Sequence, residues 1–279
     1  MKIFLVIGNP IEHSLSPKMF KWIFNALCID ARYQKKCIDK DSVNNIVDDI
    51  REGKIDGLNI TLPYKESIVN SVDILGPSAE YLKSINCISI ENNNVVGHNT
   101  DIHGFSYLIE KNNISLDNKK ILIVGAGGVS RAVVGSLISL VNNTIFLINR
   151  DNKRAKSLVD YFNNLHDDLV VSFIDDKADI GNFDIIINCT SIGLDNERYD
   201  HCSLEGSLKS KSVLIDTLYH QIETPFLKIR NRSCKFINGL DMFIGQGIAS
   251  LDLWFGNSIS NKINSTHLKE YLNSLCLKE

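Results

Sequence analysis

The sequence predicts an α/β fold with two domains, and three features of the chain indicate it. Short apolar runs of strand length alternate with amphipathic helical patterns along nearly all 279 residues. In the second half, a glycine-rich loop joins one of these apolar runs to a helix. The chain is also long enough for two domains, each with a substantial core of its own.

The first half of the chain opens with an apolar strand over residues 2–8 and a helix over 16–27. The apolar side chains of this helix share one face, and we expect Ser16 to cap its N-terminus and Pro17 to take the first helical position. The next expected elements are a strand over 31–38, a helix over 40–53 that ends at Gly53, a strand over 56–63, and a hairpin over 86–99 whose turn is Asn92 to Asn94.

The second half repeats strand and helix with a cleaner rhythm. Continuous apolar, β-branched runs between helices are typical of parallel strands that are covered on both faces. The expected strands cover 119–124, 143–150, 168–174, 183–190 and 212–218, and the expected helices cover 127–140 and 152–165. The tail over 240–277 is mostly helical, with a packed helix end at Trp254-Phe255-Gly256.

A helix near 102–112, followed by a polar segment, marks the expected domain boundary. We expect one domain from residues 1–103 plus 240–279, with the C-terminal helices packing back on the N-terminal part. The second domain then covers residues 104–239.

Composition argues against several classes of function. The net charge of −3 and the pI near 6.2 give no basic field for nucleic acid. The seven cysteines are odd in number and form no C-x-x-C, which indicates reduced thiols in the cytoplasm. No apolar run approaches the roughly 18 residues of a spanning helix, and the apolar run near the N-terminus is too short for a signal sequence. We therefore expect a cytoplasmic protein with a small-molecule partner, and neither a nucleic-acid nor a membrane partner.

The loop VGAGGVSRA places Gly125, Gly127 and Gly128 between a strand and a helix. Glycines permit a tight turn there and let backbone N–H groups approach a pyrophosphate at the positive end of the helix. The match to G-x-G-x-x-G/A is imperfect, because Ser130 stands at the third small position. The alternative is a structural turn between strand and helix.

Two arginines follow the next strand, where a Rossmann-type domain meets the adenosine ribose. Arg150 and Arg154 favour the 2′-phosphate of NADP over the free hydroxyl of NAD. Asp151 lies between them, and its carboxylate would repel a phosphate or bind a ribose hydroxyl. The alternative for Asp151 is the N-cap of the helix that follows. NCTSIG, which contains Thr190, follows another strand and suits a cofactor crevice.

A set of hydroxyl and amide side chains breaks the apolar pattern of the first domain. Each has a structural alternative as a helix cap, a turn residue or a core amide, but together they suit a small, polyhydroxylated, neutral-to-anionic ligand. The set contains Ser14, Ser16, Asn59, Thr61, Lys65, Asn86, Asn99, Thr100, Asp101 and Gln246. Carbonyl reduction leaves an alkoxide that needs a proton, and a lysine beside a carboxylate can donate it. Lys65 and Asp101 are the candidates, with Asn59 as a structural amide.

These motifs resemble those of the shikimate dehydrogenase family over nearly the full length of the chain. Eight segments occur in the family's order: HSLSP, NITLPYKE, SINCI, GHNTDIHG, GAGGVSRA, NRDNKRA, NCTSIGL and GLDMFIGQG. SINCI departs from the family's A-V-N-T but retains Asn86. The resemblance implies reversible reduction of 3-dehydroshikimate to shikimate by NADPH, a step toward chorismate and the aromatic amino acids.

The resemblance also implies roles for individual residues. Ser14 and Ser16 would hold the substrate carboxylate, and Lys65 would be the acid/base paired with Asp101. The ring hydroxyls would be held by Thr61, Asn86, Asp101 and Gln246, with Tyr219 of DTLYHQIETP also near the substrate. The NADP(H) residues would be Gly125, Ala126, Gly127, Gly128, Val129, Asn149, Arg150, Arg154, Thr190 and Gly239.

The chain departs from the family's pattern at Asp151, which replaces the usual threonine and puts strict NADP preference in question. Two alternatives stay open: a quinate/shikimate dehydrogenase with relaxed substrate or NAD use, and a non-catalytic sensor that binds shikimate. The resemblance implies no metal, and a His–Asp–His site at HNTDIH would lack a third ligand segment. A monomer or a homodimer is expected.

Overall fold

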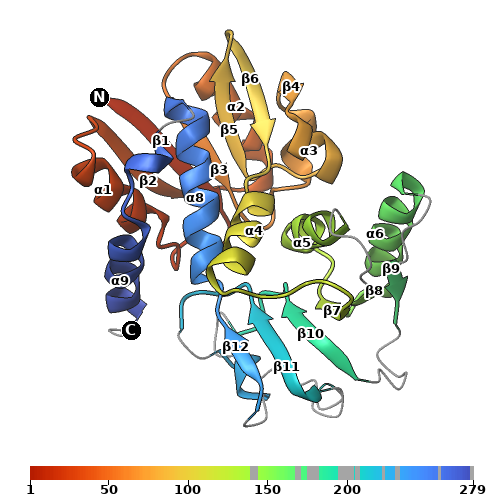
Figure 1. Cartoon of the computed structure of the whole chain (residues 1–279). Helices are drawn as coiled ribbons and strands as arrows, with labels where there is room; N and C mark the ends of the chain where they lie inside the picture. Colours follow the sequence, from red (N-terminus) through yellow and green to blue (C-terminus); the bar gives the residue numbers. More distant parts are fainter. Residues whose placement is uncertain are drawn as a thin grey trace. The chain divides into compact units, whose positions relative to one another are not determined.

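The computed structural model describes residues 1–138, 144–166, 171–174, 182–193, 204, 208–221, 224–229, 233–256 and 259–276. The chain divides into two units: unit 1 is Met1–Gly104 with Phe243–Glu279, and unit 2 is Phe105–Met242. Figure 1 colours the chain by sequence, so unit 2 runs from yellow to light blue. No helix in the described part of the chain combines the length and the apolar character that crossing a membrane requires.

Unit 1 is built on a mixed six-stranded sheet with the order β2-β1-β3-β5-β6-β4. Its strands are β1 (Lys2–Gly8), β2 (Ala31–Cys37), β3 (Gly57–Ile60), β4 (Ile74–Leu75), β5 (Cys87–Glu91) and β6 (Asn94–His98). Its helices are α1 (Ser16–Ala26), α2 (Val43–Arg51), α3 (Pro77–Leu82) and α9 (Ser265–Cys276), while α4 (Asp101–Lys111) and α8 (Leu240–Phe255) run from one unit into the other. The 3-10 helices are η1 (Lys40–Ser42), η2 (Ser67–Asn70), η4 (Ser260–Lys262) and, in unit 2, η3 (Leu227–Ile229).

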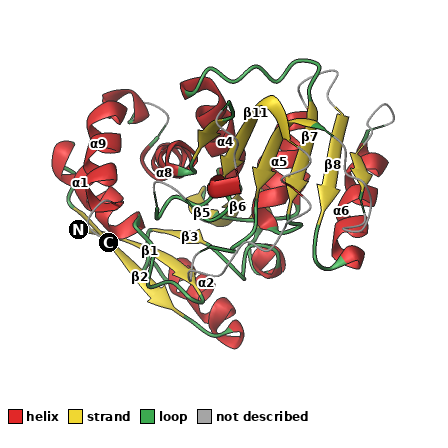
Figure 2. Ribbon diagram, turned by 90° about the horizontal axis from the view of Figure 1, so that it is seen from below, coloured by secondary structure: helices red, strands yellow, loops and turns green. Residues whose placement is uncertain are grey.

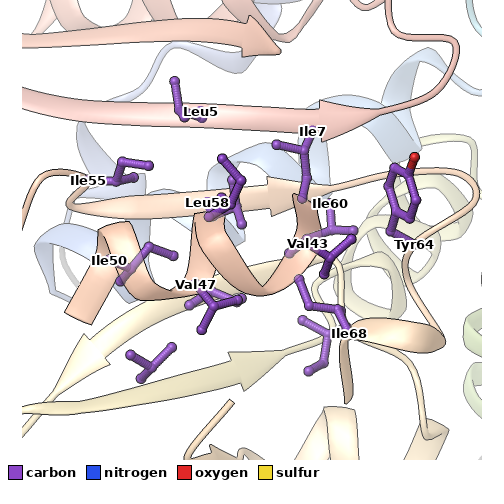
Figure 3. Close-up of a cluster of buried hydrophobic side chains, with 14 of the residues drawn as sticks. Leu5, Ile7, Val43, Val47, Ile50, Ile55, Leu58, Ile60, Tyr64 and Ile68 are labelled. Atoms are coloured by element: carbon purple, nitrogen blue, oxygen red, sulfur yellow. The ribbon is translucent and has the colours of Figure 1, made fainter. Parts of the chain in front are cut away.

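One face of this sheet packs against α2. Side chains alternate along a strand and recur every three to four residues along a helix, so each element presents one apolar face to the other. The buried cluster includes Leu5, Ile7, Val43, Val47, Ile50, Ile55, Leu58, Ile60, Tyr64 and Ile68 (Figure 3). It lies beside the polypeptide that leads from β3 to Lys65, and it therefore fixes the base of the candidate site.

The other face of the sheet is covered by an aromatic cluster that involves α1 and α8. The ring of Trp254 stacks on Phe4 with centroids 4.5 Å apart, and its indole N–H donates to the carbonyl of Ile88 at 2.9 Å. Gly57 is required at this contact, because a Cβ there would lie 2.4 Å from the indole nitrogen. The helix ends at Phe255, and Gly256 follows with a φ of +96°. The expected packed helix end is confirmed.

Unit 2 contains a fully parallel sheet with the order β12-β11-β10-β7-β8-β9. Its strands are β7 (Lys120–Val124), β8 (Thr144–Ile148), β9 (Val171–Phe173), β10 (Phe183–Asn188), β11 (Leu208–Asp216) and β12 (Lys235–Ile237); its helices include α5 (Gly128–Ile138) and α6 (Asn152–Leu165). Counted along the chain, this is the doubly wound order of dinucleotide-binding sheets, and its direction reverses between β7 and β10. Figure 2 shows several of these strands in yellow, with α5 and α6 against the sheet.

Most elements follow the sequence prediction, with one refinement and one correction. The hairpin turn consists of Asn92 and Asn93 alone, both with positive φ, because Glu91 already pairs with Asn94. Some residues of the expected segments lie outside the described residues: 139–140, 143, 168–170, 257–258 and 277. The prediction that Ser16 caps α1 was wrong: the N-cap is Leu15, and Ser16 is already helical.

Candidate active site

The centre of the site in unit 1 is an ion pair between Lys65 and Asp101. Lys65 Nζ lies 2.6 Å from Asp101 Oδ2, and the two side chains retain only 12% and 7% of their exposure. Lys65 follows β3, and its carbonyl accepts the N–H of Ile85 at 2.8 Å, which ties this turn to the segment that leads into β5. Because both groups are largely removed from water, the pair is held more rigidly than a surface ion pair.

Asn86 holds the second oxygen of the same carboxylate. Its Nδ2 donates to Asp101 Oδ1 at 2.8 Å, while its Oδ1 accepts the backbone N–H of Thr100 at 2.6 Å and the Thr100 hydroxyl at 3.1 Å. Asn86, Thr100 and Asp101 are all buried. The two oxygens of Asp101 therefore have separate partners, one cationic and one neutral.

The side chain of Asn59 contacts other protein groups through both its oxygen and its nitrogen, as expected of a structural amide. Its Oδ1 accepts from the Tyr33 hydroxyl at 2.7 Å, and its Nδ2 donates to the Asn86 carbonyl and to Ser250 Oγ. Ser250 of α8 also lies 3.3 Å from the Thr100 hydroxyl. Sequence reasoning missed Ser250, although it stands one helical turn after Gln246 and its hydroxyl donates to the Gln246 carbonyl.

The remaining predicted substrate residues lie on separate elements. Ser14 Oγ accepts the backbone N–H of Ser16, so Ser14 takes part in the entry to α1. Thr61 directly follows β3, and its N–H donates to the carbonyl of Ile7. Gln246 lies on α8 and donates to the Phe243 carbonyl, three residues earlier.

Two further residues of the sequence analysis lie elsewhere. Tyr219 belongs to unit 2, where its ring stacks on His220 with centroids 4.3 Å apart. His98 of HNTDIH contacts Glu91 and Ser89 through Nε2. Among the described residues no group of three or more His, Cys, Asp or Glu side chains could hold a metal ion.

In unit 2, the glycine loop lies where the strand order reverses. Gly125 follows β7 with a φ of +111°, and a Cβ there would lie 3.1 Å from the backbone of Cys189, which follows β10. A Cβ on Gly127 would meet no atom within 4 Å, so the loop presents open space at the start of α5. Gly239 lies against the backbone of Thr217, where a Cβ would come within 2.2 Å of the carbonyl oxygen. An open glycine loop before a helix N-terminus fits the pyrophosphate of a dinucleotide.

The residues after β8 form the start of α6. Asp151 is its N-cap, and Oδ1 accepts the backbone N–H groups of Lys153 at 2.9 Å and Arg154 at 3.2 Å. The helix-cap alternative for Asp151 is therefore confirmed. Asn149 donates to the Asp151 carbonyl, and Arg150 is exposed beside the cap. Two arginines and a helix start at this position fit an adenosine 2′-phosphate.

The end of β10 carries a second polar network. Asn188 Nδ2 donates to Asp216 Oδ1 at 2.9 Å, and Asn188 Oδ1 accepts both the N–H and the hydroxyl of Thr190. Burial raises the pKa of Asp216 to about 6, although hydrogen bonds from Thr224, Leu218 and Asn188 act in the opposite direction. Sequence reasoning had singled out Thr190 but not the buried Asn188 that contacts it, nor Asp216, which contacts Asn188.

A doubly wound sheet with an open glycine loop, and a separate unit with a buried lysine–aspartate pair, define a dinucleotide-dependent oxidoreductase. Comparison with known families narrows this class. Residues 6–88 match the shikimate dehydrogenase substrate binding domain, and residues 108–217 match the shikimate / quinate 5-dehydrogenase model. The chain belongs to the shikimate dehydrogenase family.

Similar proteins cover nearly the whole chain. The shikimate dehydrogenase (NADP(+)) of Pelagibacter ubique is 37% identical over 254 residues, 91% of this chain and 93% of the relative. The enzyme of the same name from Nitrosopumilus maritimus is 32% identical over 257 residues, 91% of this chain and 93% of the relative. The crystal structure of shikimate dehydrogenase 1 from Peptoclostridium difficile matches with a TM-score of 0.81 and 29% identity, covering 100% and 99% of the two chains. That of the Listeria monocytogenes shikimate 5-dehydrogenase with shikimate and NAD has a TM-score of 0.86 and 25% identity, covering 98% and 96%.

Proposed function

We propose that this chain catalyses the reversible reduction of 3-dehydroshikimate to shikimate with NADPH, a step toward chorismate and the aromatic amino acids. The contact between Lys65 and Asp101 carries the proposal, because reduction of a carbonyl needs a proton donor at its oxygen. Family membership and the NADP(+)-dependent relatives support the substrate and the cofactor. A similar structure, 29% identical with a TM-score of 0.81, is a complex with NADP+.

The proposed chemistry divides between a hydride and a proton. NADPH, when bound, would supply the hydride for the carbonyl carbon, which would leave negative charge on the carbonyl oxygen. Lys65 donates a proton from Nζ to that oxygen and becomes a neutral amine; in the oxidative direction it takes the proton back from the hydroxyl. Asp101 stabilises the ammonium and directs Nζ at 2.6 Å, and Asn86 fixes the other carboxylate oxygen.

The two domains divide the ligands between them. Residues 1–103 plus 240–279 supply all the proposed substrate contacts except Tyr219, and residues 104–239 bind the dinucleotide and contribute Tyr219. The substrate contacts are Ser14 and Ser16 for the carboxylate, and Thr61, Asn86, Asp101, Gln246 and Tyr219 for the ring. The NADP(H) contacts are Gly125, Ala126, Gly127, Gly128, Val129, Asn149, Arg150, Arg154, Thr190 and Gly239.

Initial rates of the purified chain test this function. Shikimate and quinate are each assayed with NADP and with NAD, by following the absorbance of the reduced nicotinamide. We expect the highest kcat/KM for shikimate with NADP. A higher kcat/KM for quinate with NAD would replace the proposal by the quinate/shikimate alternative. Tight binding of shikimate without turnover of either substrate would favour the sensor.

We also propose that the protein acts in the cytoplasm, as a monomer or a homodimer. In the part of the chain that the structure describes, the thiols of Cys28, Cys37 and Cys87 are free, which suits a reducing compartment. Cys87 is fully buried, and burial raises the pKa of its thiol to about 12, so it stays a neutral thiol. Light scattering on the protein as it elutes from a size-exclusion column measures its mass. A mass above that of a dimer would contradict the proposal.

A further inference from the structure

The buried carboxylate of Asp216 takes no part in the chemistry proposed above, yet it has three hydrogen-bond donors. Asp216 Oδ1 accepts Asn188 Nδ2 at 2.9 Å and the backbone N–H of Leu218 at 3.1 Å, and Oδ2 accepts the Thr224 hydroxyl. Asp216 and Asn188 are fully buried, and Thr224 is 1% exposed. The two buried residues are register partners at the ends of neighbouring strands β10 and β11.

The carboxylate determines which way the neighbouring amide faces. An ionised carboxylate can only accept hydrogen bonds, so the amide nitrogen of Asn188 must face Asp216. The amide oxygen therefore faces the other way, where it accepts the N–H of Thr190 at 3.1 Å and its hydroxyl at 2.7 Å. A flipped amide would set its NH₂ group against the N–H of Thr190, and two donors would oppose each other.

The amide in turn determines the role of the Thr190 hydroxyl. A hydroxyl has one proton to donate and two lone pairs to accept with. The proton of Thr190 is committed to Asn188, and one lone pair faces the N–H of Ile192 at 3.3 Å. One lone pair is left, so the hydroxyl can only accept from a ligand. Thr190 lies after β10 beside Gly125, at the point where the strand order reverses.

We propose that Asp216, acting through Asn188, is a positioning residue that holds the Thr190 hydroxyl as a hydrogen-bond acceptor for a hydroxyl or amide N–H donor of the bound dinucleotide. This inference rests on the proposed function, because it takes NADP(H) as the ligand. A phosphate oxygen, which carries no proton at neutral pH, is excluded as the partner of Thr190.

A double-mutant cycle tests the proposal. The dissociation constant of NADPH is measured by nucleotide fluorescence, without substrate, for wild type, Thr190→Val, Asp216→Ala and the double variant. Valine removes the hydroxyl at nearly constant shape, and we expect about 3- to 10-fold weaker binding, the value of one hydrogen bond. Asp216→Ala weakens binding by a similar factor, and the double variant is no weaker than Thr190→Val alone.

Two control variants separate positioning from stability. In Asp216→Asn the amide oxygen can still accept from Asn188 and Leu218, and its NH₂ can donate to Thr224, so NADPH affinity stays within about twofold of wild type. Thr224→Val removes the donor to the far oxygen of Asp216 and the acceptor for the Leu227 N–H, but it leaves the contact with Asn188 intact, so it lowers Tm and leaves the affinity unchanged. Should Asp216→Ala not fold, Asn188→Ser takes its place, because serine is too short to reach Thr190.

Hydrogen exchange of the nucleotide-free protein gives an independent measurement. The N–H groups of Thr190 and Leu218 exchange faster in Asp216→Ala and at the wild-type rate in Asp216→Asn. Independent effects of Asp216→Ala and Thr190→Val on affinity, or failure of Asp216→Asn to retain affinity, would overturn the assignment. If the wild-type protein binds no NADPH, both the proposed function and the role of Asp216 are overturned. If it binds NADPH but Asp216→Ala and Thr190→Val affect the affinity independently, only the role of Asp216 is overturned.

Discussion

The two units contain the same small hydrogen-bond pattern in different surroundings. In unit 1, the Asn86 amide donates to Asp101 and accepts both the N–H and the hydroxyl of Thr100. In unit 2, an asparagine, an aspartate and a threonine repeat this pattern as Asn188, Asp216 and Thr190. Each asparagine is almost completely buried. In both units, the amide is oriented by a carboxylate on one side and a threonine on the other.

The difference between the two patterns is the fourth partner. Asp101 has Lys65, whose ammonium lies 2.6 Å from Oδ2. Asp216 has the neutral hydroxyl of Thr224 at the equivalent oxygen. A carboxylate that holds a cation can support proton transfer, whereas a carboxylate that holds only neutral donors fixes their directions. We therefore propose that the same arrangement serves chemistry in unit 1, where the lysine is present, and positioning in unit 2, where it is not.

Removal of the lysine should have the largest effect of any change in these networks. We expect Lys65→Ala to lower kcat by roughly 10²-fold or more, because the oxygen of the substrate loses its proton donor. Substrate binding should change less, since the other polar side chains of the site remain. Steady-state kinetics with shikimate and NADP measure both effects.

Lys209→Ala is a matched control for this experiment. Lys209 lies at the same 2.6 Å from a carboxylate, that of Asp184, but the pair is on the surface of unit 2 and its lysine is 41% exposed. The control should lower kcat by less than twofold, because a surface pair contributes only about 0–1 kcal/mol to stability. If the rate of Lys65→Ala equals that of Lys209→Ala, the acid/base role is wrong.

The sequence predicted much of the fold because its signals are local. The glycine loop, the apolar strand runs and the hairpin each depend on neighbouring residues, and all of them occur in the structure. The cap of α1 was predicted wrongly for a local reason as well. Ser16 has the chemistry of an N-cap, but the helix begins at Ser16 itself and Leu15 takes the cap position. Helix ends are the least certain part of such a prediction.

The candidate site was only partly accessible from sequence. Lys65 and Asp101 stand out because each belongs to a segment whose polar side chains break the apolar pattern of the first domain. Ser250 and Asp216 do not stand out, since a serine on a helix and an aspartate at the end of a strand both have ordinary structural uses. Their importance comes from contacts with residues far away in the sequence. Ser250 contacts Asn59, which is 191 residues away, and Asp216 contacts Asn188, which is 28 residues away. Contacts at that separation follow from the tertiary fold and not from local pattern.

Because the buried carboxyl group of Asp216 has a shifted pKa, we expect the stability of the folded protein to depend on pH. Burial raises its pKa from 3.8 to about 6, so the folded protein binds this proton more tightly than the unfolded chain does. The contribution to the free energy of unfolding therefore falls as pH rises from about 4 to about 6, by on the order of 2–3 kcal/mol. Asp216→Asn has no such titration, so its free energy of unfolding should rise relative to that of wild type as pH increases over the same range. Denaturant unfolding at each pH measures both values.

Asp184→Asn provides a control of opposite sign. Burial acts to raise the pKa of Asp184, but hydrogen bonds from Lys209 and from the Lys120 backbone outweigh it, so the pKa lies below 3.8. This carboxylate stabilises the folded state above its unfolded pKa, and that stability is lost as pH falls. Asp184→Asn should therefore lose stability relative to wild type as pH rises. The same slope for both variants would show that the pH effect does not come from the buried charge.

A third aspartate, Asp151, should give the smallest effect and sharpen the comparison. It has neither a lysine partner nor a buried asparagine, and its carboxylate caps α6 beside Arg150 and Arg154. Asp151→Ala should lower stability by about 1 kcal/mol through loss of the cap. Asp151→Thr keeps a capping oxygen without the charge, so it should recover most of that stability and bind NADP a few-fold more tightly, because a carboxylate near the 2′-phosphate repels it. Affinity for NAD should stay unchanged in calorimetry. Weaker NADP binding by Asp151→Thr would instead assign the carboxylate a direct contact with the ribose.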